Sequence, residues 1–393
     1  MRSRLGLPEA SERLLDEHVR FDGLDARSVS LALNEPMELP FGRVDSRPSG
    51  WVRLDVAMHG STVTGFGEGA TLQEPLFTDD SGKNIARNIL AIGRDVTAGS
   101  KTPRDAIDRI AAFRFADGSY PTARLALEMA VIDGVAKAGS LSVASLIGVP
   151  AVIQDVHYGK SIGSGDEDGI LQQVQAAIEQ KAKKIKLKIS PTTFLTVSRA
   201  IERIKADYPA VEIMVDANGS FDVLSREDLA GIDRLDGQGL VMIEEPVSRV
   251  GRVRGLDAVA RLRSALPNMA TPVCLDDCLR TRDDCERALG DGLADIVNIK
   301  PGRIGSFLGS IALINDAKAY GKQVMVGGML EATPGRSMTS VLGAYCVGLG
   351  FTIPGDLSLA QERLAEDLVS SDKQMKLNAE GRIVLPNGHG WGF

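Results

Sequence analysis

Histidine, cysteine and aromatic residues are scarce in this sequence. Its 393 residues include 4 His, 4 Cys and 2 Trp, and aromatic residues make up 5% of the chain. The histidines are scattered too widely for a His-based metal site or a Ser-His-Asp triad: His18, His59, His157 and His389. We therefore expect any acid–base chemistry to fall to lysines and carboxylates.

Long apolar runs and an excess of positive charge are also lacking. No run of about 18 apolar residues occurs, so no membrane span is expected, and the N-terminus has no apolar segment of a signal peptide. The net charge of −7 does not favour nucleic acid or an anionic membrane as a partner. The spacing of the cysteines fits no zinc motif, and so long a chain needs no disulfides, which favours a reducing cytoplasm: Cys274, Cys278, Cys285 and Cys346.

The length of the chain predicts two domains, preceded by a polar arm. We assign residues 1–26 to an N-terminal extension that is either frayed or in contact with another subunit. One side of a short helix in it would carry Leu14, Leu15, His18 and Val19. Residues 27–150 are expected to form a capping domain of the α+β class.

Strands are expected first in this capping domain. From about Arg27 apolar and polar residues alternate, which predicts antiparallel strands over 28–33, 52–57 and 63–68. Residues 40–50 (PFGRVDSRPSG) are rich in Gly, Pro and Arg, and we expect a long loop there. The segment GFGEGA resembles a phosphate loop but lacks the following helix, so we interpret it as a strand end.

Helices are expected in the rest of the capping domain. The pair Thr102-Pro103 predicts a helix start, because Thr caps a helix and Pro is favoured in its first turn. The segment Thr122–Gly148 is apolar almost all round, which predicts a buried helix followed by a shorter one.

Residues 151–373 alternate short, branched apolar runs with helical segments, which is typical of βα units. The runs number eight, the first near Ile153–Tyr158 and the eighth at Phe351–Pro354, and eight strands close a TIM barrel. Residues 374–393 are expected to form a return strand and a tail that pack on the N-terminal sheet.

Charged residues stand near the carboxyl ends of five consecutive apolar runs. Successive positions 188, 216, 244, 276 and 300 are 28, 28, 32 and 24 residues apart, about the length of a strand, a helix and two loops. The carboxyl ends of barrel strands are where such folds carry their chemistry. We therefore predict an active site built from Lys186, Lys188, Asp216, Glu244, Asp276 and Lys300.

Three of these residues are acids from neighbouring strands. Carboxylates pressed together repel one another and are stable only with a cation. Oxygen ligands without His or Cys select magnesium, or manganese in its place. The alternative is three separately solvated carboxylates at helix N-termini. Because strand alternation sends Glu244 and its neighbour Glu245 to opposite sides, we predict Glu244 as the ligand.

Lys188 and Lys300 belong to strands four apart in a ring of eight, so they would face each other across the barrel mouth. In that arrangement one lysine would lie on each face of a planar enolate. A bound dication lowers the pKa of a neighbouring lysine, so its amine can act as a base near neutrality. We therefore predict removal of a proton next to a carboxylate. Two alternatives are a Schiff-base aldolase using Lys300, which leaves the three acids unexplained, and a barrel without enzymatic activity.

In order and spacing, the motifs KLK, DAN, EEP, LDD, NIKPGRIG and GGMLE resemble the enolase superfamily, in its muconate-lactonizing-enzyme subgroup. The resemblance runs from about Arg27 to the C-terminus. It is closest to o-succinylbenzoate synthases and N-acylamino-acid racemases, through NIKPGRIG, GGMLE and IPGDLS. It implies an α/β fold, a modified TIM barrel of the (β/α)7β type with an N-terminal α+β capping domain. It also implies a small-molecule carboxylate substrate and a homo-oligomer.

The same resemblance implies residue roles. Magnesium would be held by Asp216, Glu244 and Asp276, and Lys188 and Lys300 would be the acid/base pair. Residues that keep these ligands and lysines in place would be Lys186, Asn218, Asp277 and Glu331. The substrate would be bound by Gly328, Met329 and Arg336, with the segment before Gly50 closing over the site.

The sequence departs from the family pattern at three places near the expected pocket. Asp277 stands where Glu is usual, Cys278 replaces a small hydroxyl residue, and ATPGR at 332–336 replaces TGIGR. None of these removes a catalytic group, so they bear on the substrate rather than on the chemical step.

Two reactions share this predicted chemistry. Dehydration of the o-succinylbenzoate synthase type needs one lysine as the base, whereas racemisation of an N-acylamino acid needs both. Both lysines are present, so the sequence does not separate the two. Muconate cycloisomerase-like lactonisation and dipeptide epimerase-like activity are the alternatives, although no DxD motif follows the last strand, which argues against the epimerases.

Overall fold

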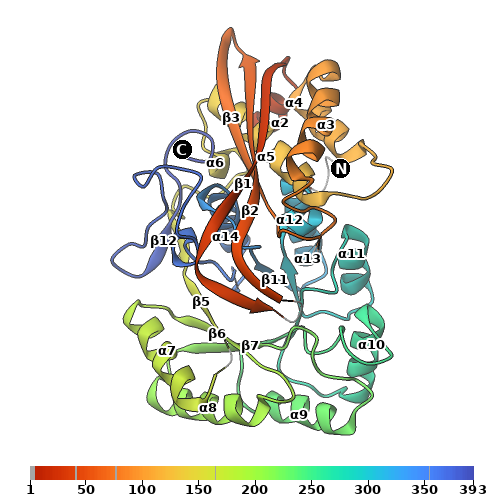
Figure 1. The fold of residues 1–393 in the computed structure, drawn as a ribbon, viewed down its shortest axis with the longest axis vertical. Helices are drawn as coiled ribbons and strands as arrows, with labels where there is room; N and C mark the ends of the chain where they lie inside the picture. Colours follow the sequence, from red (N-terminus) through yellow and green to blue (C-terminus); the bar gives the residue numbers. More distant parts are fainter. Residues whose placement is uncertain (1–4, 40–41, 76–77, 164, 354) are drawn as a thin grey trace.

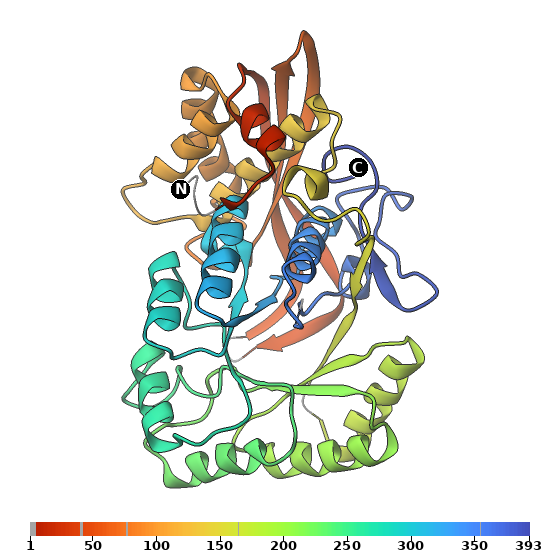
Figure 2. The same cartoon turned by 180° about the vertical axis from the view of Figure 1, so that it is seen from behind.

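The computed structural model describes residues 5–39, 42–75, 78–163, 165–353 and 355–393. Figure 1 shows an antiparallel sheet with several helices in the upper part and a curved parallel sheet bordered by helices in the lower part. Seen from behind in Figure 2, the C-terminal segment lies beside the upper part. The predicted α/β class with a capping domain is thus confirmed, while the predicted domain boundaries stay predictions.

The N-terminal segment packs on the capping domain instead of fraying. Helix α2 (Glu9–Leu15) precedes strand β1 (Arg20–Leu39), which starts earlier than the expected first strand. The side chains of Leu14, Leu15 and Val19 are buried in the main core, whereas His18 is exposed. Fraying does not describe these buried residues, whereas contact of this arm with another subunit stays a prediction.

The capping sheet has three antiparallel strands, as predicted; their order is β1-β2-β3, with β2 at Gly42–Met58 and β3 at Ser61–Ala70. The prediction of a long loop at 40–50 is wrong for residues 42–50, which belong to β2. Residues 40–41 lie outside the described residues. The ladder of β1 and β2 continues through Pro48 and Val44. Because the pairing of β2 with β3 ends at Ser49, Pro48 lies where β2 has only one partner, and its missing N–H is tolerated there.

Four helices complete the capping domain, and the longest packs on β3. At Gly65 and Gly67 a Cβ atom would lie 2.0 Å and 1.9 Å from the carbonyl oxygens of Ala130 and Ala126, so only glycine allows this close approach. The glycines of GFGEGA therefore serve helix packing, within a strand as predicted. The helices are α3 (Ile85–Gly99), α4 (Pro103–Ala112), α5 (Pro121–Ala138) and α6 (Val143–Leu146).

The two predicted helical features of this region are confirmed. Thr102 caps α4, since its side chain accepts a hydrogen bond from the backbone N–H of Asp105. Helix α5 is buried along almost its whole length, as its apolar sequence predicts. Even so, within the described ranges no helix combines the length and the apolar character that crossing a membrane requires.

The lower part is a parallel sheet of seven strands that follow one another in chain order. They are β5 (Gly159–Ile162), β6 (Lys184–Lys188), β7 (Glu212–Asp216), β8 (Ile243–Glu244), β9 (Val273–Leu275), β10 (Ile296–Ile299) and β11 (Gln323–Val326). The associated helices are α7 (Glu167–Glu179), α8 (Phe194–Asp207), α9 (Arg226–Asp236), α10 (Gly255–Ala265), α11 (Arg282–Gly290), α12 (Pro301–Ile304), α13 (Phe307–Ala319) and α14 (Thr333–Gly348).

The count of eight barrel strands needs correction at both ends. The first apolar run forms β4 (Asp155–His157), which pairs antiparallel with β12 (Arg382–Val384) and lies outside the parallel sheet. The last run, of which residues 351–353 are described, forms no strand. Instead, the Asp356 N–H donates to Val326 O of β11 at 3.0 Å, and Leu357 O accepts from Gly159 N of β5 at 2.9 Å. An irregular segment thus joins the two edge strands, before a short 3-10 helix, η1 (Ala360–Glu362).

The C-terminal tail contacts the capping domain, but its strand does not pair there. Strand β12 pairs with β4 and not with the N-terminal sheet. Beyond it, the buried Trp391 donates its indole N–H to Met129 O of α5 at 3.2 Å, and its ring packs edge-on against Phe307. The ring of Phe393 lies 6.5 Å and 6.4 Å from those of Trp51 and Phe66. The end of the tail therefore covers the outside of the sheet and α5.

Candidate active site

The carboxyl ends of adjacent strands bring the predicted charged residues together. Lys188, Asp216 and Glu244 end β6, β7 and β8, and they are register partners across the sheet. Asp276 and Lys300 come directly after β9 and β10. The parallel register therefore places all five residues along one edge of the sheet.

The three acids are buried. Asp216, Glu244 and Asp276 expose only 2%, 0% and 2% of their surface, which contradicts the alternative of separately solvated carboxylates. Burial is the largest cause that raises the pKa of Glu244, and with the charges of Asp216 and Asp276, against the opposing effect of Lys186, it brings that pKa to about 8. The acids are thus close enough to repel one another.

Lys186 and Asn298 hold Glu244 from two directions. The Lys186 ammonium donates to Glu244 Oε2 at 2.9 Å and pairs with Asp356 at 2.5 Å, and it lies 3.9 Å from Asp216. The Asn298 amide donates to Glu244 Oε1 at 2.8 Å. Burial lowers the pKa of Lys186, but Asp356 and Glu244 outweigh it and raise that pKa well above its usual value. Lys186 is therefore a fixed cation inside the acid cluster.

The two lysines predicted as the acid/base pair contact different acids. Lys188 Nζ lies 2.6 Å from Asp216 Oδ2 and donates to the Asn218 side-chain oxygen at 2.7 Å. Lys300 Nζ lies 2.6 Å from Asp276 Oδ2. Strands β7, β8 and β9 separate the strands that carry them, so the lysines approach the acid cluster from its two ends.

The two lysines also differ in burial. The side chain of Lys188 is 37% exposed and that of Lys300 is 19% exposed. Burial lowers the pKa of Lys300, but Asp276 raises it above the ordinary value. Lys300 is therefore held as a cation by its carboxylate partner.

Glu244 and Glu245 point in opposite directions, as strand alternation predicts. Glu245 is turned away from the lysines and accepts the backbone N–H groups of Asp276 at 2.7 Å and Cys278 at 3.0 Å. The hydroxyl of Ser248 also donates to it. Glu245 thus fixes the loop that carries Asp276, whereas Glu244 faces the cluster.

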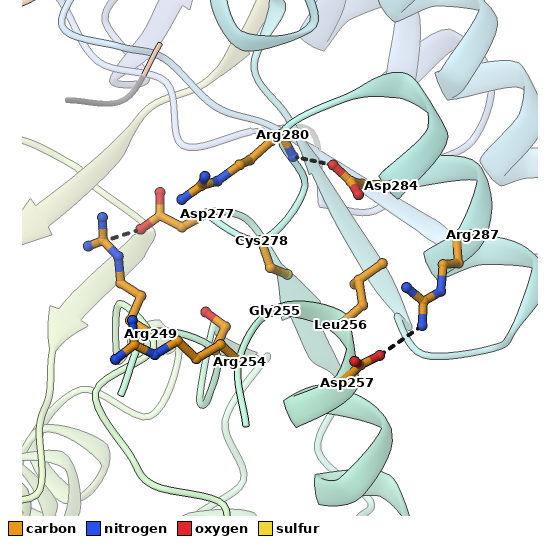
Figure 3. A pocket seen from close by; sticks show the side chains of 11 residues that line it. Arg249, Arg254, Gly255, Leu256, Asp257, Asp277, Cys278, Arg280, Asp284 and Arg287 are labelled. Carbon is orange, nitrogen blue, oxygen red and sulfur yellow. Dashed lines mark hydrogen bonds and ion pairs between the residues drawn. The ribbon is translucent and has the colours of Figure 1, made fainter. Parts of the chain in front are cut away.

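Asp277 lies beside the acid cluster and lines a separate cavity. Figure 3 shows it pointing toward Arg249, 3.5 Å away, at a cavity of about 570 Å³ near the start of α10. Its other partner, Arg303, lies 3.6 Å away and donates to Asp276 at 2.6 Å. The side chain of Asp277 is therefore linked to that of the predicted metal ligand Asp276 through Arg303.

Of the residues predicted to bind substrate, Gly328 and Met329 lie in the turn after β11 and Arg336 lies in α14. A Cβ at Gly328 would lie 2.5 Å from Arg336 Nη1 and 2.6 Å from Glu331 Oε2, so both side chains lie against this glycine. Glu331 accepts the Met329 N–H at 2.7 Å and lies 3.7 Å from Arg336. Pro334 falls in the first turn of α14, where proline is tolerated. Glu331 thus holds the turn itself, through contacts with Met329 and Arg336.

Three residues that contact the cluster had no predicted role: Asn298, Arg303 and Asp356. Asn298 and Lys300 share the two-residue period of one strand, which would have placed the Asn298 side chain on the same side as Lys300. No sequence pattern would have placed the Arg303 side chain near the cluster, because its position depends on the short helix α12. Asp356 lies on the irregular closing segment, where no periodicity applies.

The donor set is chemically suited to a hard cation. It consists only of carboxylate oxygens from neighbouring strands, the ligands that Mg²⁺ prefers. Among the described residues, however, no three His, Cys, Asp or Glu side chains are gathered closely enough to hold a metal ion. The carboxylates are instead paired with Lys186, Lys188, Lys300 and Arg303. Holding a dication therefore requires these ion pairs to rearrange.

Comparisons with known proteins agree on one family. Residues 169–393 match the family described as Enolase C-terminal domain-like. The chain is 30% identical over 380 residues to an N-succinylamino acid racemase of an Amycolatopsis species, covering 94% of this chain and 92% of the relative. It is 29% identical over 322 residues to the o-succinylbenzoate synthase of Bacillus subtilis strain 168, covering 80% of each. A solved structure of an enolase superfamily member from Listeria innocua superposes with a TM-score of 0.80 at 25% identity, covering 95% of this chain and 94% of that one.

Proposed function

Since the chain belongs to the Enolase C-terminal domain-like family, we propose that it removes a proton from the carbon next to a substrate carboxylate. It is an enzyme of the lyase or isomerase type. The reaction is either dehydration, as in an o-succinylbenzoate synthase, or racemisation of an N-acylamino acid. The observation that carries this proposal is that Lys188 and Lys300 flank three buried carboxylates from opposite ends.

We assign the metal-binding role to Asp216, Glu244 and Asp276, with Mg²⁺ as the ion and Mn²⁺ as its substitute. Enzymes of this superfamily use such a dication to stabilise the negative charge that develops when the proton leaves. Lys186 and Asn298 would keep Glu244 turned toward the ion. Arg303 would hold one oxygen of Asp276 and so orient that carboxylate.

The lysines carry the proton at Nζ. While Lys300 is paired with Asp276 its ammonium keeps its proton, because the carboxylate raises its pKa. A bound Mg²⁺ would supply another counter-charge for the acids, and Lys188 and Lys300 would then be the groups that accept a proton as free amines. Racemisation uses both lysines on opposite faces of the substrate. Dehydration would use one lysine as the base, which takes the α-proton at Nζ and returns it to the departing hydroxide so that water leaves, while the other lysine remains a cation beside the developing charge.

Turnover of two substrates tests the proposal. Purified protein with Mg²⁺ is given the dehydration substrate of o-succinylbenzoate synthases in one assay and a single enantiomer of an N-succinylamino acid in the other. Formation of o-succinylbenzoate or loss of optical activity is expected, and the ratio of the two rates defines the main reaction. Turnover of neither substrate would contradict the proposal.

We further propose a reducing, cytoplasmic setting, which is supported by four cysteines that are all free thiols. Assembly into a homo-oligomer stays a prediction.

A further inference from the structure

A buried arginine connects the capping domain to the pocket turn. In Figure 1 the hairpin of β1 and β2 descends from the capping domain to the edge of the barrel. Arg47 lies on this part of β2, opposite Leu31 in the ladder, and is only 2% exposed. Its Nη2 donates a hydrogen bond to the carbonyl oxygen of Met329, which follows β11. One side chain thus spans the two parts of the molecule.

The surroundings of Arg47 keep it charged. Burial lowers its pKa to about 10, while Glu331 and Glu68 favour the cation and Arg336 opposes it. Its Nε atom is buried and has no hydrogen-bond partner among the described residues. A buried donor without a partner costs stability, typically about 1–3 kcal/mol, and an apolar side chain would avoid this cost. Arg47 is therefore poorly explained as a residue that serves stability alone.

The turn that Arg47 holds packs against the Lys300 side of the site. The Met329 sulfur would lie 2.9 Å from a Cβ at Gly302, two residues after Lys300. A Cβ at Gly327 would lie 2.9 Å from the Cε atom of Lys300 itself. A displacement of this turn therefore reaches Lys300 directly.

The Lys188 side of the site has different supports. Lys188 is held by Asp216 and Asn218, at the carboxyl end of β7. These supports belong to the parallel sheet and not to the turn after β11. Lys188 is thus held by residues other than those of the turn that Arg47 contacts.

We propose that Arg47 is a positioning residue that sets the location of Lys300 relative to the substrate, through Met329 and the turn at 327–329. This inference rests on the proposed function, because it concerns the lysine that carries the proton on one face. A residue of the capping domain would then influence proton transfer on the substrate face that Lys300 serves.

The test follows exchange of the α-proton for deuterium in D2O, separately for the D and L enantiomers of an N-succinylamino acid with Mg²⁺. Each enantiomer presents its proton to one lysine, and Lys300→Ala identifies the enantiomer that depends on Lys300. We expect Arg47→Met to slow exchange of that enantiomer by about tenfold or more, since small misplacements have such effects. Exchange of the other enantiomer should stay within about threefold of the wild type. Arg47→Lys keeps a charged donor and should recover part of the loss.

Arg53 provides a matched control on the same strand. Its side chain is 54% exposed and lies 3.3 Å from Asp55 on the surface, so Arg53→Met should leave both exchange rates unchanged. Equal slowing of both enantiomers by Arg47→Met and Arg47→Lys would overturn the proposal and leave Arg47 a structural residue. Unchanged rates in folded variants would overturn it as well. Absence of exchange by the wild-type protein with either enantiomer would instead overturn the proposed function, and the inference with it.

Discussion

Replacing Glu68 by Gln should change how the stability of the protein depends on pH. Glu68 is on β3 and joins the capping sheet to the start of α14. Its carboxylate accepts the N–H groups of Ala332 and Gly335, both at 2.8 Å, and the Ser49 hydroxyl at 2.9 Å. Burial nevertheless dominates and raises its pKa from 4.5 to about 7. Gln keeps one acceptor oxygen at nearly the same size but cannot ionise.

The size of the effect follows from this pKa. The folded protein binds the proton more tightly than the unfolded chain, so unfolding releases protons between about pH 4.5 and pH 7. The stabilisation from this group is therefore complete below about pH 4.5 and is lost as the pH rises through about 7. A difference of about 2.5 pKa units corresponds to roughly 3 kcal/mol. Glu68→Gln should abolish this part of the pH dependence.

Urea unfolding at pH 5 and pH 8 measures the effect, with tryptophan fluorescence as the signal. Trp51 stacks on Phe66, two residues from Glu68, so the signal reports on this sheet. Between the two pH values the wild type should lose roughly 2–3 kcal/mol more than Glu68→Gln. Glu366, an exposed acid, is the control, and Glu366→Gln should follow the wild type. Equal losses in the wild type and Glu68→Gln would refute the reasoning from burial.

Two further predictions concern packing. Gly67→Ala should lower the unfolding free energy by about 3 kcal/mol or more, because its Cβ would lie 1.9 Å from Ala126 O. The control Gly60→Ala has no atom within 4 Å of the added Cβ and should cost only the strain of its positive φ, about 1–2 kcal/mol. Thermal unfolding compares the two variants, and equal losses of stability would argue against a close contact of α5 with β3. Trp391→Ala should lower the free energy of unfolding by about 3–5 kcal/mol, because the indole is buried against Phe307 and α5. Urea unfolding measures this loss, and a loss below about 1 kcal/mol would mean that the tail is not needed for stability.

The parallel strands and the charged residues on them were predictable because two regularities coincide. Branched apolar runs mark buried strands, and chemistry in barrels lies at strand ends, so Lys188, Asp216 and Glu244 could be placed without a structure. The opposite orientations of Glu244 and Glu245 followed from the two-residue period of a strand. The capping sheet, with its clear alternation, was predictable for the same reason.

The remaining features depend on contacts between distant segments. Pro48 and the glycines at 42 and 50 indicate a loop locally, yet pairing with β1 holds this stretch as a strand. The run at Ile153–Tyr158 has the composition of a barrel strand, but its partner β12 lies at the other end of the chain. Arg47 and Asp356 reach the site only through tertiary packing, and no local pattern marks either residue.

The most direct test of the central claim is deuterium uptake at the carbon next to the substrate carboxylate, measured by NMR in D2O for both enantiomers of an N-succinylamino acid. With Mg²⁺ the wild type should exchange both enantiomers, and removal of divalent ions by a chelator should stop exchange. Lys188→Ala and Lys300→Ala should each lose exchange of a different enantiomer while still binding Mg²⁺, and the double variant should exchange neither. Exchange that persists in the double variant, or in the chelated wild type, would contradict proton transfer by these two lysines beside a metal held by the three acids.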